Sequence, residues 1–414
     1  MLKILHTSDW HLGRRLYGQT RYETFAAFLN WLYDCIVKQQ IDVLIVAGDI
    51  FDSMTPSNKA QALYYEFLGR ISQSGTCQHI IIVAGNHDSP SLLDAPKDVL
   101  KFLNVHIIGT ACENIEEEVI TLNNKNNEPQ AIILAVPYLR DKDVRKSNAG
   151  ESSTQKQSQV VAGITKHYAQ ATEFAAQKQN DYLKKYGKKV PLVATGHLMA
   201  IGGKTTSDDG VRDLYIGSLG GVSANMFDPI IDYVALGHLH VPQLVGGNEH
   251  IRYSGSPIPM GFGEANQQKQ VLLIEFTDEM HIKPINIPTF QRLAQIKGDM
   301  DHITQQINQL KTLNEPVWIE VIYNAKQIVS NLSEQLHQLV QASDIEIIKI
   351  NNTQTYQKIL KQTEQSESLH DLSREDVFAR CLETHDISED QRTELMACFQ
   401  EIVYEIEHDD VRAE

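Results

Sequence analysis

The chain has 414 residues, of which 42% are hydrophobic and 22% charged, so it can bury a large core and is too long for one compact domain. This composition excludes a disordered chain, a collagen-like repeat and a small disulfide-linked scaffold. The net charge of −16 argues at first against a nucleic-acid partner, but residues 362–414 alone hold 16 acidic and 4 basic residues, which leaves the rest nearly neutral.

The five cysteines are scattered without a CxxC pair, and an odd number cannot all pair within one chain. Reduced thiols in the cytoplasm are the simplest interpretation. The apolar runs are far shorter than the roughly 20 residues that a membrane span needs, and the first residues lack the apolar stretch of a signal peptide. We therefore expect a cytoplasmic protein that does not insert into a membrane.

Short apolar runs rich in β-branched residues predict buried strands in the first 290 residues, and they alternate with helical patterns. The predicted strands are residues 3–5, 43–47, 80–84, 132–136, 192–194 and 233–236, and the predicted helices include residues 22–38 and 59–72. Such alternation is typical of an α/β protein with a central sheet.

The pattern of apolar residues changes after Pro288. Strand-like runs cover residues 292–296, 317–323 and 345–350, with a helical pattern in each interval. This order predicts a small β-α-β-α-β unit over residues 289–352, separate from a first domain over residues 1–288.

The end of the chain is polar and acidic. Residues 353–368 are rich in Gln and Thr, which predicts a linker. Residues 369–414 are predicted to form two short amphipathic helices that begin near Ser373 and Ser388. The second helix carries apolar residues on one face, namely Leu395, Phe399, Ile402 and Ile406. These residues need a covering surface, which favours a partner protein over a merely solvated acidic face.

Side chains of metal-ligand type follow five of the predicted strands, several of them through a glycine. Glycine allows the backbone to turn sharply or to approach a ligand, and ligands gather at the carboxyl ends of strands in α/β proteins. The motifs are Asp-x-His, Gly-Asp-x-x-Asp, Gly-Asn-His-Asp, Gly-His and Gly-His-x-His, which hold Asp9, His11, Asp49, Asp52, Asn86, His87, Asp88, His197, His238 and His240. If these strands share a sheet, two Asp, one Asn and four His converge in one crevice, with His87 beside them.

Two buried carboxylates would be unfavourable without a counter-charge, and divalent metal would supply one. Imidazole and carboxylate ligands without Cys suit Mn, Fe or Zn better than Mg or Ca. Seven ligands exceed the capacity of one tetrahedral ion, which predicts two ions sharing a carboxylate. Such a pair acts on the attacking and the leaving oxygen of a phosphoryl displacement.

In this order, the five motifs resemble those of the calcineurin-like metallophosphoesterase family. The opening residues 4–13 and the segments 47–52, 212–217 and 253–259 narrow the resemblance to the DNA-repair nucleases of that family. The resemblance covers most of residues 1–290 and continues in the order and size of the later segments. It implies a four-layer αββα sandwich, an αβ capping domain and a helical partner-binding segment.

The resemblance also implies a role for each site residue. One metal ion, expected to be Mn²⁺, would be held by Asp9, His11 and His240, and the other by Asn86, His197 and His238, with Asp49 bridging both. His87 would stabilise the charge on the scissile phosphate or protonate the leaving oxygen. Either Asp52 or Asp88 would orient the His87 ring, and the sequence does not decide between them.

The activity implied by the resemblance is metal-dependent hydrolysis of DNA in repair, recombination and replication. It would comprise a 3′→5′ exonuclease on duplex ends and an endonuclease on hairpins or single strands. An ATPase subunit with long coiled-coil arms would control it, in a heterotetramer with two copies of this chain.

Two groups of basic residues are candidate contacts for DNA phosphates, with solvated basic loops as the alternative. They are Arg14 and Arg15, and Arg140, Lys142, Arg145 and Lys146. Two other functions use the same motifs. A phosphoesterase for small phosphodiesters or phosphoproteins needs no DNA groove, so salt-dependent binding of duplex ends separates it from a nuclease. A scaffold with an inactive metal site is separated by turnover with Mn²⁺.

Overall fold

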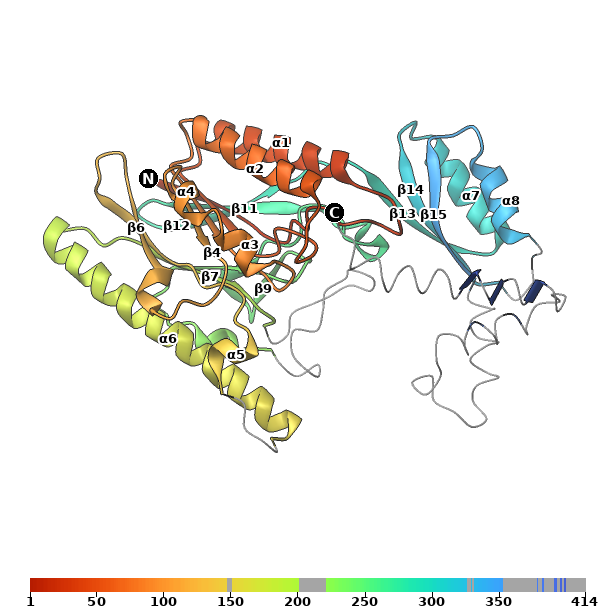
Figure 1. Ribbon diagram of the computed structural model, residues 1–414. Helices are drawn as coiled ribbons and strands as arrows, with labels where there is room; N and C mark the ends of the chain where they lie inside the picture. The colour runs from red at the N-terminus through yellow and green to blue at the C-terminus, as the bar shows by residue number, and fades with distance from the viewer. Residues whose placement is uncertain are drawn as a thin grey trace. The chain divides into compact units, whose positions relative to one another are not determined.

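The computed structural model describes residues 1–146, 151–200, 221–325, 329 and 331–352, together with eight helical positions between 378 and 399 (Figure 1). The chain divides into two compact units, Met1–Gln291 and Arg292–Glu414. Among the described helices, none combines the length and the apolar character needed to cross a bilayer.

Two six-stranded sheets make up most of the first unit. In spatial order, the first sheet contains β12 (Met280–Asn286), β11 (Gln270–Phe276), β1 (Leu2–Thr7), β2 (Val43–Ala47), β3 (His79–Val83) and β4 (Val105–Ile108). The second sheet contains β5 (Val119–Asn123), β6 (Pro129–Leu134), β7 (Leu192–His197), β8 (Tyr233–Gly237), β10 (Asn248–Tyr253) and β9 (Gln243–Val245). In the first sheet, β1, β2, β3 and β4 pair in parallel, each with the next. In the second sheet, β6, β7, β8 and β10 do the same. The carboxyl ends of these strands therefore lie at one edge of each sheet.

The sheets stack face to face. Helices α1 (Tyr22–Gln39) and α2 (Asn58–Gln73) cover the outer face of the first sheet (Figure 1), where Phe28 and Phe67 pack into a core with the strands. The core between the sheets joins residues of both, such as Ile45 and Ile133. Burial on both faces explains why the central strands are continuous apolar runs.

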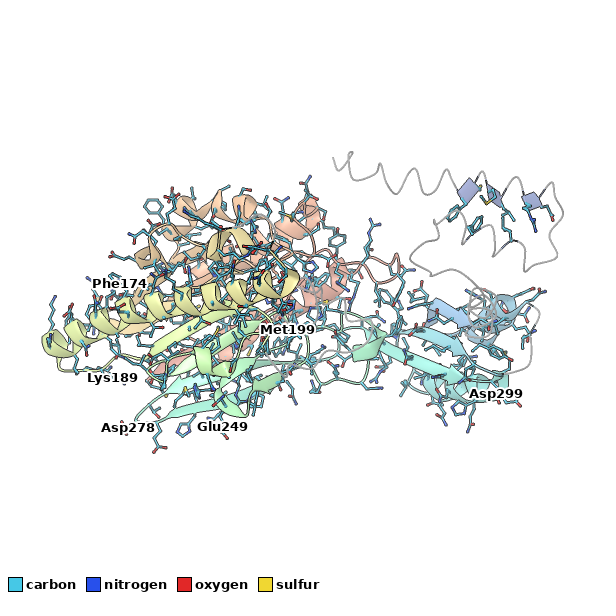
Figure 2. All side chains as sticks on the ribbon, turned by 90° about the horizontal axis from the view of Figure 1, so that it is seen from below. Phe174, Lys189, Met199, Glu249, Asp278 and Asp299 are labelled. Carbon is cyan, nitrogen blue, oxygen red and sulfur yellow. The ribbon has the colours of Figure 1, made fainter. Side chains whose placement is uncertain are left out.

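Helix α6 (Ser153–Tyr186) lies along the outer face of the second sheet (Figure 2). Phe174, labelled there, packs against that core. Ser152 caps its first turn by accepting from the backbone N–H of Gln155, and Gly187 ends it in the left-handed conformation. The order helices, sheet, sheet, helix confirms the predicted αββα sandwich. Sequence patterning placed no helix here, because part of its buried face is formed by small residues, Ala171 and Ala175.

The remaining elements of this unit are short. They are α3 (Pro90–Asp94), α4 (Lys97–Lys101), α5 (Asp141–Val144), η1 (Ile115–Glu118), η2 (Ala224–Met226) and η3 (Phe262–Glu264).

The second unit has a three-stranded parallel sheet in the order β13-β14-β15. Its elements are β13 (Arg292–Gly298), α7 (Met300–Lys311), β14 (Val317–Tyr323), α8 (Leu332–Val340) and β15 (Ile345–Asn352). Ile303 and Ile307 of α7 and Leu336 of α8 pack with the strands into a separate core. These elements occur in the predicted order.

Little of the chain's end is described. The predicted linker 353–368 lies outside the described residues, as do most of residues 369–414 and the segment 212–217. Of the tail, the described positions are helical, and the rings of Phe378 and Phe399 stack with centroids 4.1 Å apart.

Candidate metal centre

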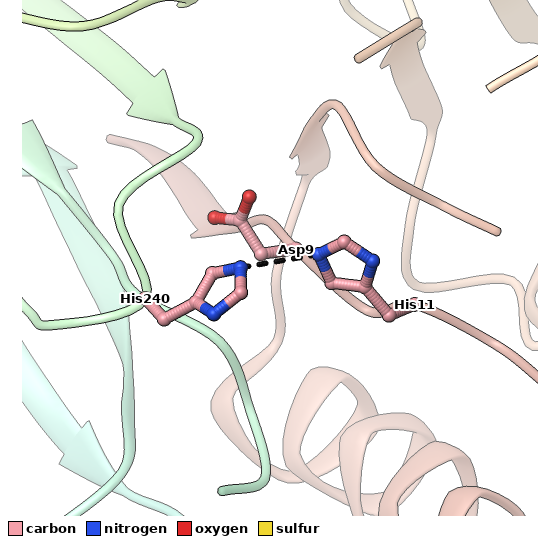
Figure 3. Close-up of side chains that lie close together, drawn as sticks. All are labelled: Asp9, His11 and His240. Atoms are coloured by element: carbon pink, nitrogen blue, oxygen red, sulfur yellow. Dashed lines mark hydrogen bonds between the residues drawn. The ribbon is translucent and has the colours of Figure 1, made fainter. Parts of the chain in front are cut away.

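The structure brings the predicted ligand types of the two sheets together (Figure 3). Asp9, His11, Asp49 and Asn86 follow β1, β2 and β3 of the first sheet, and the other histidine ligands come from the ends of β7 and β8 in the second. Among the described residues, three overlapping groups of side chains have ligand atoms within 4.8 Å of one another. They are Asp9, His11 and His240; Asp9, Asp49 and His197; and His11, Asp52 and His87.

The Asp49 carboxylate lies between His11 and His197. Its Oδ2 is 3.5 Å from Nε2 of His11 and 3.3 Å from Nε2 of His197. Nε2 of His197 is also 3.0 Å from Oδ1 of Asn86, and the His238 ring lies 5.4 Å from the His197 ring. In this position, the Asp49 carboxylate can contribute a ligand oxygen to each of two neighbouring sites.

The backbone at the site adopts conformations that most residues avoid. Asp9, His11 and Asp49 have φ angles of 54°, 47° and 51°, in the left-handed region. The neighbouring glycines permit close approach, since a Cβ on Gly48 would lie 2.2 Å from Nδ1 of His197. A Cβ on Gly237 would lie 1.9 Å from the carbonyl oxygen of Ala47. The strand-end glycines therefore allow the two sheets to meet.

Contacts behind the imidazoles orient their Nε2 atoms. Nδ1 of His197 lies 3.0 Å from the carbonyl oxygen of Ala47, which can only accept, so Nδ1 carries the proton. Nε2 of His11 and Nε2 of His240 face each other at 3.1 Å (Figure 3). Two imidazole nitrogens at this distance fit the ligand positions of one shared cation.

His87 contacts the first sheet through both its main chain and its ring. Its backbone N–H donates to Oδ1 of Asp49 at 2.8 Å, and its Nδ1 donates to the carbonyl oxygen of Asp52 at 2.8 Å. Of the two residues predicted to orient the ring, Asp52 makes this contact, through its main-chain carbonyl rather than its carboxylate. The Asp88 carboxylate instead accepts the backbone N–H groups of Ile50, Phe51 and Gly85, and so holds two ligand loops together.

The charges of the site shift the pKa values of its members. Burial would raise the pKa of Asp49, but His197, His11 and His87 hold it well below its usual value. Burial alone would lower the pKa of His197, but the charges of Asp49 and Asp9 outweigh this effect and raise the pKa to about 9. Burial and the Asp49 charge raise the pKa of Asp88 to about 7. Two buried carboxylates among imidazoles, with no thiol, are a donor set that fits two divalent ions.

Comparison with known proteins agrees with this geometry. Residues 2–242 match the family model of the calcineurin-like phosphoesterases, and residues 289–386 match one described as the Type 5 capsule protein repressor C-terminal domain. The chain is 34% identical to the SbcD subunit of the SbcCD nuclease of Escherichia coli strain K12 over 96% of this chain and 97% of that one. Identity to the SbcD subunits of Rhodobacter capsulatus and Bacillus subtilis is 32%, over 76% and 66% of this chain and 77% and 66% of theirs.

The chain belongs to the SbcD family of calcineurin-like phosphoesterases. The match confirms the resemblance expected from the motifs. It also extends through the C-terminal third, where the motifs were fewest.

The basic residues of this SbcD-family chain have different surroundings. Arg14 lies at the site, with Nη1 3.2 Å from Oδ1 of Asp52, and Arg15 is exposed. Arg140 is half-buried, and Lys142 and Lys146 are exposed. Arg145 corrects the prediction, because its guanidinium is paired with Asp141 and Glu151 and its side chain is only 6% exposed. We therefore remove it from the candidate DNA contacts.

Two residues near the site were not predicted. Glu264 is fully buried 3.4 Å behind His240, and it pairs with the buried Lys269. A single Glu and a single Lys outside any strand-end motif carry no signal in one sequence.

Proposed function

We propose that this chain is the nuclease subunit of an SbcCD complex and hydrolyses DNA phosphodiester bonds. The observation that carries the proposal is the position of the Asp49 carboxylate, between His11 and His197, with His87 hydrogen-bonded to the same carboxylate. The family of the chain supports the choice of substrate, since its relatives are named as nuclease subunits.

The centre would hold two divalent ions. The resemblance predicts Mn²⁺, which is one of the metals that mixed imidazole and carboxylate ligands suit. Asp9, His11 and His240 would hold one, Asn86, His197 and His238 the other, and Asp49 both. When bound, such ions lower the pKa of water and offset the charge that develops on phosphate.

His87 would act on the phosphate or on the leaving oxygen. Since its Nδ1 donates to Asp52, its Nε2 is the atom that can accept or donate a proton at the site. Arg14, Arg15, Arg140, Lys142 and Lys146 remain the candidate contacts for DNA phosphates.

The test of this function uses the purified protein, with and without SbcC and ATP, on end-labelled duplex and hairpin DNA. Mn²⁺, Mg²⁺ and a chelator are compared side by side. We expect Mn²⁺-dependent shortening of duplexes from their 3′ ends and cutting of hairpins, with ATP-dependent control through SbcC. If the protein turned over a small phosphodiester but neither cleaved DNA nor bound it in a salt-dependent way, the alternative phosphoesterase function would be favoured.

We propose that residues 369–414 bind SbcC. The exposed Leu395 and the stacked Phe378 and Phe399 support an apolar helical segment there. Deletion of residues 369–414 should abolish co-purification with SbcC while Mn²⁺-dependent nuclease activity persists. If the truncated chain still binds SbcC, the assignment of the tail is wrong.

We also propose that two copies of the chain pair within a cytoplasmic SbcCD heterotetramer. A compact apolar surface supports this, since Val99, Phe102 and Leu103 in and after α4 are 69%, 90% and 44% exposed. Phe102→Asp should convert a dimer into a monomer in sedimentation, whereas Tyr65→Asp, at a separate exposed aromatic residue of α2, should not. A variant Phe102→Asp that sediments like the parent would contradict this interface.

A further inference from the structure

Two imidazoles on the Asp9 side of the centre have a carboxylate behind them. Nδ1 of His11 lies 3.4 Å from Oδ1 of Asp52, and Nδ1 of His240 lies 3.4 Å from Oε1 of Glu264. Asp52 is partly exposed at the site, whereas Glu264 is fully buried and has no part in the proposed hydrolysis. A buried carboxylate needs a reason, because burial of an ion is unfavourable unless it is paired.

The two oxygens of Glu264 have different surroundings. Oε2 accepts from Nζ of Lys269, from the backbone N–H of Met260 at 3.1 Å and from Oγ of Ser256 at 3.3 Å. Oε1 has no hydrogen bond within the described part of the chain, and neither has Nδ1 of His240. These buried atoms are 3.4 Å apart, so a small ring rotation satisfies both.

Lys269 connects this carboxylate to the main chain of the ligand. Its Nζ, on a residue only 4% exposed, also donates to the carbonyl oxygen of His240 at 3.2 Å and to Oγ of Ser256 at 3.0 Å. The ammonium group of Lys269 gives the buried Glu264 carboxylate a paired counter-charge.

We propose that Glu264, held in place by Lys269, is a positioning residue that accepts the Nδ1 proton of His240 and turns Nε2 toward the metal on the Asp9 side. This inference rests on the proposed metal centre. A ligating imidazole commonly donates its second N–H to a carboxylate, which fixes the tautomer and makes the ligand more basic. On the other side of the centre, His197 has only the neutral carbonyl of Ala47 in this place. We therefore expect the two ions to bind with different affinities, and Glu264 to affect only the ion on the Asp9 side.

The test is a calorimetric Mn²⁺ titration of the metal-free full-length protein, with electron paramagnetic resonance of the loaded protein as a second readout. In Glu264→Gln, we expect one of two Mn²⁺ ions to bind about 10–100-fold more weakly and the other to be unchanged. The resonance signal of the coupled pair should weaken at Mn²⁺ concentrations that saturate the parent.

Glu118→Gln is the matched control. Glu118 is equally buried in the same unit and lies 2.7 Å from Nε2 of His167, which belongs to none of the three ligand groups. Its substitution removes a buried carboxylate–histidine contact and should leave both Mn²⁺ affinities unchanged.

A double variant, Glu264→Met with Lys269→Met, guards against misfolding. Replacing both members of a buried ion pair by apolar residues often preserves stability, and urea unfolding checks that it does. We expect this folded variant to show the same selective loss of one Mn²⁺ ion. Parent-like Mn²⁺ affinities in both Glu264 variants would overturn the role of Glu264 but not the proposed metal centre. An equal loss of Mn²⁺ affinity in Glu118→Gln would do the same. A parent that binds no Mn²⁺ would overturn the proposed centre as well.

Discussion

The two sheets of the first unit make different contributions to the centre. The first sheet supplies both carboxylates, Asp9 and Asp49, and the second supplies His197, His238 and His240. Each sheet alone presents an incomplete set of ligands. The site is therefore a property of the contact between the sheets, and four substitutions test this from the largest expected effect to the smallest.

Asp49→Asn removes the shared carboxylate from the first sheet. We expect nuclease activity to fall by about 10³-fold or more, because both ions lose a charged ligand. Elemental analysis should show less bound metal. Asp42→Asn is the control, since Asp42 precedes the same strand at its opposite end and binds the backbone N–H of Lys3. Parent-like activity in Asp49→Asn would remove the basis of the whole assignment.

His87→Ala leaves the ligands of both sheets in place. We expect the metal content to stay at the parent level while cleavage falls by about 10²–10⁴-fold, as for loss of a general acid. The measurement is single-turnover cleavage of duplex ends at saturating Mn²⁺. His79→Ala, at the start of the strand that His87 follows, should retain turnover. A His87→Ala protein that cleaves at the parent rate would show that the role is wrong.

Gly237→Ala acts on the contact between the sheets. Its Cβ would lie 1.9 Å from the carbonyl oxygen of Ala47, so the sheets must shift apart at the ligands. We expect the free energy of unfolding to fall by about 1–3 kcal/mol and Mn²⁺ affinity to fall with it. Gly69→Ala, in α2 with no atom within 4 Å of the new Cβ, should be neutral or slightly stabilising in the same urea titrations.

His6→Gln tests the interior of the sandwich rather than the ligands. Nδ1 of His6 lies 2.9 Å from the hydroxyl of Tyr233 in the other sheet, and burial lowers the pKa of His6 to about 3. In the unfolded chain, the His6 imidazole binds a proton below about pH 6.5, whereas in the folded protein it does so only near pH 3. The contribution of His6 to the free energy of unfolding is therefore fully present above pH 6.5 and decreases as the pH falls toward 3. Between about pH 7.5 and 5.5, the parent should lose about 1 kcal/mol more than His6→Gln in urea unfolding. Equal losses in the two proteins would show that His6 binds a proton as readily in the folded protein as in the unfolded chain.

The fold class and the ligand set were predictable because their signals are local. A buried parallel strand is a continuous apolar run, as in residues 43–47, and its functional residue follows directly, as Asp49 does. The same logic covers His197 and His238. Helix α6 was missed because alanines supply part of its buried face.

The partners of those ligands were decided by the tertiary structure. The oxygen that orients His87 belongs to the main chain of Asp52. A main-chain contact cannot be predicted from residue types, because every residue has a carbonyl oxygen. Arg145 is a basic residue of the kind that contacts DNA phosphates, but its guanidinium is paired with Asp141 and Glu151.

By itself, therefore, the sequence determined which side chains reach the edge of each sheet, because each follows its strand within a few residues. Only the tertiary structure decided how the two edges face each other and what stands behind each imidazole. Glu264 and His240 are 24 positions apart, and packing and charge alone bring them together.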